Sequence, residues 1–63
     1  MKIETRKLES LIANQARSYK EVATAAGVTE RTLQSARSGA EIRTATAGRI
    51  AAALGVDVET IIK

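Results

Sequence analysis

The chain has 63 residues, contains neither cysteine nor histidine, and carries ten Lys and Arg against seven Asp and Glu. A chain of this length forms one domain, residues 1–63, and it has no thiol or imidazole group for a disulfide, a zinc site or nucleophilic catalysis. We therefore expect a protein that is not an enzyme and that needs no metal and no cofactor.

Basic residues are concentrated in the first three quarters of the chain. Residues 1–49 hold nine bases and five acids, a net charge of +4, while residues 50–63 hold Lys63 against Asp57 and Glu59. This pattern favours a polyanion as partner, although a charged surface also serves simply to keep a small protein soluble. No apolar run reaches the ~20 residues of a membrane span, and no signal peptide is evident. We expect a cytoplasmic protein without a membrane partner.

The first helix is predicted around Leu8, Leu11 and Ile12, which have the i, i+3, i+4 spacing of one helix face. Ala16 extends this apolar stripe by one turn. The pattern stops around Arg17, so we expect the first helix to end there.

The second helix is predicted to begin after Ser18, because Ser18 and Glu21 have the spacing of a capping box. In this motif the serine hydroxyl accepts from the amide of the glutamate, whose carboxylate accepts from the amide of the serine. Gly27 ends the helix, since the left-handed conformation after a helix costs least at glycine. The buried face is expected to hold Val22, Ala23 and Ala26.

A third helix follows directly after a short turn. Thr29 is expected to cap its N-terminus, and Leu33 and Ala36 are expected to be buried. The helix ends at Ser38–Gly39, before a loop formed by residues 40–43.

The fourth helix is predicted from about Ala45 to Leu54, with Gly55 ending it. Its apolar residues recur at i, i+3, i+4 and i+7, namely at Ala47, Ile50, Ala51 and Leu54. A last short helix, capped by Asp57, is expected to carry Val58, Ile61 and Ile62. The predicted fold is therefore all-α, a compact domain of five helices whose many alanines allow close helix packing.

The outward face of the third helix is almost entirely polar. With Leu33 at the centre of the buried side, a rotation of about 100° per residue assigns Arg31, Ser35 and Ser38 to the outward face and Thr32 and Gln34 to its borders, and Glu30 stands at the helix start. These donors and acceptors suit base edges in the major groove of DNA, where Arg reads guanine, Gln reads adenine and Glu accepts from cytosine. The alternative interpretation is an ordinary solvated helix face.

Two stretches carry a family resemblance, namely "SYKEVATAAGVTERTLQSARSG" and "AGRIAAALGVDVETII". The first contains an Ala-Gly-Val turn and a glycine after the third helix, and the second contains a Leu-Gly-Val turn. Over residues 8–62 the chain resembles the helix-turn-helix domain of the phage repressor and Cro (XRE-like) family. The resemblance implies a lambda-repressor-like fold in which helices 2 and 3 form the helix-turn-helix. Helix 3 then enters the major groove, and helix 2 lies across the DNA backbone.

The resemblance also implies which residues contact DNA. The family's base-reading positions correspond to Glu30, Arg31 and Ser35, with Thr32 and Gln34 as secondary candidates. Contacts to the DNA backbone are expected from Ser18, Tyr19, Lys20, Thr29, Ser38, Ala40 and Arg43.

Two residues depart from the family pattern. Tyr19 replaces a frequent Gln, and its hydroxyl still donates one hydrogen bond to a phosphate. Arg37 stands where the family often has an acid that pairs with a base on helix 1. Because Arg37 lies only about 40° from the centre of the buried side, we expect a structural role for it. Its candidate partners are Glu9, Glu41 and a DNA phosphate.

The resemblance further implies a homodimer that is weak in solution and stabilised on DNA. Its surface is expected at residues 40–43 and at Gly55–Lys63, with an apolar patch of Val56, Val58 and Ile62.

Together these features predict a sequence-specific regulator of transcription that binds double-stranded DNA. We expect a bacterial or phage-encoded protein of Cro or repressor type that occupies a palindromic operator. Two alternatives stay open, namely a protein–protein module on the same fold, such as an antitoxin or coactivator, and the isolated N-terminal domain of a longer repressor. Affinity that falls steeply with salt indicates DNA, whereas a neutral protein interface responds weakly.

Overall fold

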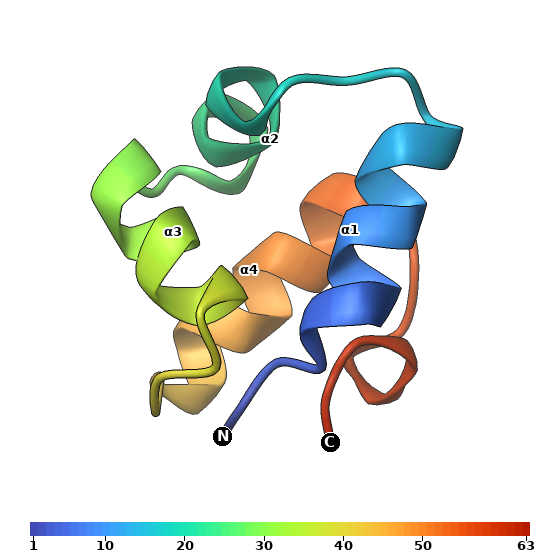
Figure 1. Cartoon of the computed structure of the whole chain (residues 1–63). Coiled ribbons are helices and arrows are strands. Elements are labelled where there is room, and N and C mark those ends of the chain that lie inside the picture. Colours follow the sequence, from blue (N-terminus) through green and yellow to red (C-terminus); the bar gives the residue numbers. More distant parts are fainter.

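The computed structural model describes residues 1–63 as four α-helices followed by one short 3-10 turn. These elements are α1 (Thr5–Asn14), α2 (Tyr19–Ala26), α3 (Glu30–Arg37), α4 (Thr44–Leu54) and the turn η1 (Val58–Thr60). Figure 1 shows α1, α2 and α3 arranged around α4, with both termini at the same end of the molecule. The predicted all-α fold is confirmed.

The interior of the domain is aliphatic. Its largest fully buried side chains are those of Ile3, Leu8, Val22, Leu33, Ile50 and Ile61. Buried alanines from α2, α3 and α4 fill the remaining space, and no polar or charged residue is buried. All residues predicted to be buried in helices 2, 3 and 4 lie in the interior. Small side chains at these positions allow short helices to pack closely.

Helix α2 ends in a left-handed turn at Gly27. After α2, the Gly27 amide donates to the Thr24 carbonyl at 3.2 Å and the Val28 amide donates to the Ala23 carbonyl at 3.0 Å. These two bonds define a Schellman motif, and Gly27 has the left-handed backbone that the motif requires, with φ at 74°. The predicted end of helix 2 is therefore confirmed.

The end of α1 differs from its prediction. Ala16 does not extend the apolar stripe but is exposed, with φ at 53°. Its amide donates to the Ala13 carbonyl at 3.0 Å, and the Arg17 amide donates to the Ile12 carbonyl at 3.3 Å. Ala16 thus holds the left-handed position of a Schellman motif, which reverses the chain and turns the methyl group away from the core.

Side chains from the α1–α2 connection cap the C-terminus of α4. The Gln15 amide group donates to the Leu54 carbonyl at 2.8 Å, and the Arg17 guanidinium donates to the Ala53 carbonyl at 2.7 Å. Carbonyls in the last turn of a helix have no partner within it. The positive charge of Arg17 also interacts favourably with the negative end of the helix dipole.

The predicted fifth helix is present only as the single 3-10 turn η1. Ile61 is fully buried, and Ile62 forms an antiparallel bridge with Ile3. After this one turn the chain places Ile61 in the core and Ile62 beside the N-terminal segment. Asp57 precedes the turn as predicted, but its side chain makes no capping hydrogen bond.

Residues 1–4 join two distant parts of the chain. The Ile42 amide donates to the Met1 carbonyl at 2.8 Å, the Lys63 amide to the Lys2 carbonyl at 3.0 Å, and the Glu4 amide to the Ile61 carbonyl at 2.7 Å. The N-terminal segment therefore lies between the α3–α4 loop and the C-terminal residues. It holds in place the loop that carries two candidate DNA contacts.

Candidate nucleic-acid interface

Local hydrogen bonds fix where α2 and α3 begin. The Ser18 amide donates to the Glu21 carboxylate at 2.9 Å, and the Glu21 amide donates to the Ser18 hydroxyl at 3.1 Å. The Ser18 bonds lower the pKa of Glu21 below its ordinary value, because they stabilise the charged carboxylate. At α3 the Thr32 amide donates to the Thr29 hydroxyl at 3.1 Å. Both predicted caps are confirmed.

The five candidate base-reading residues all lie on α3. Leu33 and Ala36 turn inward and are fully buried. Of the five candidates, Thr32 is half-buried and its hydroxyl accepts from the Thr29 hydroxyl at 3.0 Å. The other four are exposed, namely Glu30, Arg31, Gln34 and Ser35. The helix thus offers positive, negative and neutral hydrogen-bonding groups on one solvent-facing side.

Six of the seven candidate backbone contacts are exposed, namely Ser18, Lys20, Thr29, Ser38, Ala40 and Arg43. The Ser38 hydroxyl donates to the Ser35 carbonyl at 2.7 Å, at the end of α3. Lys20 and Arg43, like Arg31 on α3, take part in no ion pair within the chain. Their charges are therefore free to meet an anionic partner.

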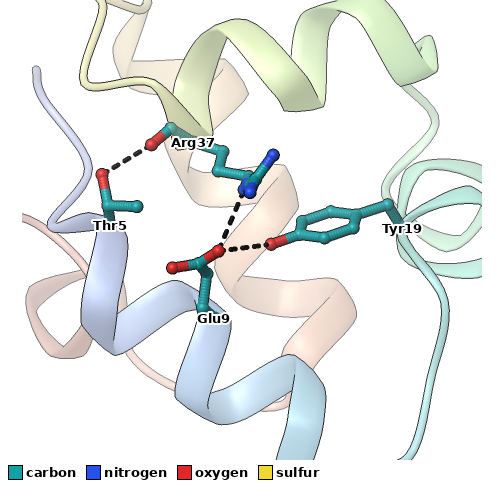
Figure 2. Close-up of polar contacts among 4 residues, drawn as sticks. All are labelled: Thr5, Glu9, Tyr19 and Arg37. Atoms are coloured by element: carbon teal, nitrogen blue, oxygen red, sulfur yellow. Dashed lines mark hydrogen bonds and ion pairs between the residues drawn. The ribbon is translucent and has the colours of Figure 1, made fainter.

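Tyr19, the seventh candidate, is half-buried and points toward α1 (Figure 2). Its hydroxyl lies 3.5 Å from the Glu9 carboxylate, to which it donates. Burial raises the pKa of Tyr19, and the Glu9 charge raises it further, while the Arg37 charge acts in the opposite direction. The phenol therefore stays protonated and can serve as a donor at neutral pH.

Arg37 forms an ion pair with Glu9, one of the two acids expected for it. The Arg37 Nε lies 3.1 Å from the Glu9 Oε2, and the guanidinium lies 5.1 Å from the centre of the Tyr19 ring. Glu41, the other acid, instead accepts from the N-terminal amine. The ion pair between α1 and α3 is therefore present, with the acid on α1 and the base on α3.

The candidate dimer residues Val56, Val58 and Ile62 are half-buried and pack against the core. Met1 is the single exposed large hydrophobic residue of the chain. The C-terminal segment thus offers only a limited apolar surface to another molecule.

Sequence reasoning missed two contributions to the site. Ile3 is fully buried, and the Thr5 hydroxyl donates to the Arg37 carbonyl at 2.5 Å. Neither residue belongs to a periodic pattern. Ile3 is a lone apolar residue between Lys2 and Glu4, and its place just before the first apolar stripe was the only indication in the sequence that it is buried.

A family comparison matches residues 8–61 to the family described as Helix-turn-helix. This chain belongs to that family, in its phage repressor and Cro (XRE-like) branch. The matched range contains α2, the Gly27 turn and α3, and with them every candidate contact to DNA. The helix-turn-helix family consists of DNA-binding domains of transcription regulators rather than enzymes. No curated protein matches the chain. None of its helices has the length and hydrophobicity needed to cross a lipid bilayer.

Proposed function

We propose that this helix-turn-helix protein binds double-stranded DNA in a sequence-specific manner and regulates transcription by occupying an operator. In this proposal α3 lies in the major groove and reads bases through Glu30, Arg31 and Ser35, with Thr32 and Gln34 as further readers. The start of α2 and the loop after α3 contact phosphates on either side. Occupancy blocks access of polymerase or of another regulator.

The observation that carries the proposal is the division of α3 into two sides. Leu33 and Ala36 hold the helix against the core, while its polar side chains face solvent. The unpaired cations Lys20, Arg31 and Arg43 supply charge for phosphates and for guanine. A helix of this kind, set in a helix-turn-helix, suits groove binding.

Selection of bound sequences from a random DNA pool at moderate salt tests the proposal. We expect an enriched palindrome, and binding to it should weaken by orders of magnitude between about 50 and about 200 mM salt. A pool without enrichment, together with an affinity that is insensitive to salt, would favour the protein–protein module instead.

We further propose that two copies bind the operator with two-fold symmetry. One short recognition helix provides few base contacts, and two helices placed about 34 Å apart double them. Val56, Val58 and Ile62 leave only a limited apolar surface exposed, which fits an interface that is weak in solution and assembles on DNA. Binding should be cooperative and should depend on half-site spacing, which a titration of operators with altered spacers measures. Binding that ignores the spacing would indicate a monomeric binder.

A further inference from the structure

One carboxylate oxygen on α1 contacts both helices of the helix-turn-helix. The Glu9 Oε2 accepts from Arg37 Nε of α3 at 3.1 Å and from the Tyr19 hydroxyl of α2 at 3.5 Å. The Arg37 guanidinium also lies over the Tyr19 ring, 5.1 Å from its centre. Figure 2 shows the three side chains converging from three helices. We refer to Glu9, Tyr19 and Arg37 as the three-helix cluster.

The three-helix cluster links α1 to α2, a helix pair that packs only slightly. The closely packed helix pairs are α2–α4, α2–α3 and α1–α3. Contact between α1 and α2 is slight by comparison, and the bond from Tyr19 to Glu9 bridges these two helices. Arg37 bonds to α1 at two points. Its guanidinium donates to Glu9, and its backbone carbonyl accepts from the Thr5 hydroxyl at 2.5 Å. Glu9 thus contacts both α2 and α3 from α1.

Solvent exposure limits what the cluster contributes to stability. The Glu9 and Arg37 side chains are 43% and 46% exposed, so water and salt screen their attraction. Exposed ion pairs of this kind contribute little to folding. The hydrogen bond from Tyr19, at 3.5 Å, is also long and therefore weak.

The cluster is continuous with the candidate DNA surface. A groove of about 350 Å³ between α1 and α3 is lined by Thr5, Glu9, Gln34, Arg37 and Ser38. Gln34 is a candidate base reader and Ser38 a candidate backbone contact. A shift of Arg37 against Glu9 would therefore move the end of α3 from which both contacts project.

We propose that Glu9 is a positioning residue for DNA reading, which aligns α3 with the bases through Arg37 and Tyr19 without touching DNA. This inference rests on the proposed function. It assigns to Glu9 an effect on the discrimination between DNA sequences rather than on DNA affinity as such. Without the carboxylate, α3 samples more than one orientation relative to α1.

The variant Glu9→Gln tests the proposal, with Glu4→Gln as its control. Both changes remove one negative charge beside α1, and Glu4 lies outside the cluster, where its side chain accepts from the Lys7 amide at 3.1 Å, as a glutamine can too. We expect Glu9→Gln to lower the ratio of operator to scrambled-DNA affinity by about tenfold, the size of one misaligned base contact. The control should leave the ratio unchanged. Equal changes on both DNAs for Glu9→Gln would overturn the proposal.

A charge exchange provides the rescue. Glu9→Arg and Arg37→Glu each place like charges together, and each should lower the affinity ratio. The double variant restores an ion pair and the original net charge, so the ratio should recover toward that of the parent. A double variant as poor as the worse single variant would contradict the positioning role.

A measurement without DNA separates this inference from the proposed function. If the parent protein binds operator and scrambled DNA equally, the proposed function fails. Residual dipolar couplings of backbone amides in the free protein then decide the positioning claim alone. We expect the α1–α3 orientation to change or to become averaged in Glu9→Gln but not in Glu4→Gln. Identical orientations in both variants and the parent would overturn the proposal.

Discussion

Ala16 has a left-handed backbone conformation, which glycine has at the ends of α2 and α4. Its φ of 53° is close to the values of 74° at Gly27 and 72° at Gly55, and all three residues close a Schellman motif. A non-glycine residue in the left-handed region is destabilised because its Cβ approaches the following carbonyl. The exposed methyl group of Ala16 makes no core contact in return. The α1–α2 connection therefore holds local strain.

We predict that Ala16→Gly stabilises the protein by about 0.5–1 kcal/mol, since the relief of left-handed strain exceeds the added entropy of the unfolded chain. The reverse change, Gly27→Ala, should destabilise the protein by about 1 kcal/mol. A Cβ at Gly27 would meet no atom within 4 Å, so that cost comes from the backbone alone. Urea unfolding measures both. A loss of stability in Ala16→Gly would contradict the strain at this turn.

Arg31 and Lys20 are both exposed and unpaired, yet they should act differently on DNA. Loss of a bidentate contact to guanine costs roughly 1–3 kcal/mol and relaxes the preference at one base, whereas loss of a phosphate contact weakens all sequences alike. We predict the first pattern for Arg31→Ala and the second for Lys20→Ala, measured on operator and scrambled DNA. Equal losses on both DNAs for Arg31→Ala would remove it from the base readers.

At the scale of elements, α2 depends on its capping box for a defined start. The Glu21 carboxylate accepts from the Ser18 amide, and this bond lowers the pKa of Glu21. A lowered pKa in the folded state gives stability that is present above the ordinary value of 4.5 and is lost as the pH falls through the folded value. Ionisation of Glu21 therefore strengthens the capping box at the start of α2.

We predict that acidification from about pH 7 to about pH 3 lowers the melting temperature of the parent more than that of Glu21→Gln. Glutamine preserves the capping box but does not titrate. Glu41, whose pKa the N-terminal amine lowers, titrates in both proteins, so their difference isolates Glu21. Parallel pH profiles would show that Glu21 does not contribute through its charge.

Local signals predicted the elements well, and long-range requirements explain what they missed. The boundary residues Ser18, Gly27, Thr29 and Gly55 act through bonds to their own neighbours in sequence, which patterns record directly. The bridge from Ile3 to Ile62 joins opposite ends of the chain and has no local signature. Next to this bridge the predicted fifth helix is only one 3-10 turn. For the site, the polar side of α3 was readable from helical spacing, but the Glu9 partnership of Tyr19 was not.

At the scale of the whole molecule, the two termini and the α3–α4 loop form one connected unit. Residues 1–4 bond to Ile42 in the α3–α4 loop on one side and to Ile61 and Lys63 on the other. The loop that carries Ala40 and Arg43 is thereby fixed relative to the C-terminal segment proposed for dimer contact. This connection suits a protein whose two copies must present their recognition helices at one fixed separation.

The central claim is that α3 reads base sequence in the major groove, and methylation protection with dimethyl sulfate tests it most directly. The reagent attacks guanine N7, which lies in the major groove, and adenine N3, which lies in the minor groove. On the selected operator, we predict protection of guanine N7 in two short stretches centred about 34 Å apart, with adenine N3 left reactive. Guanine N7 that stays fully reactive at saturating protein, or protection confined to adenine N3, would contradict the account.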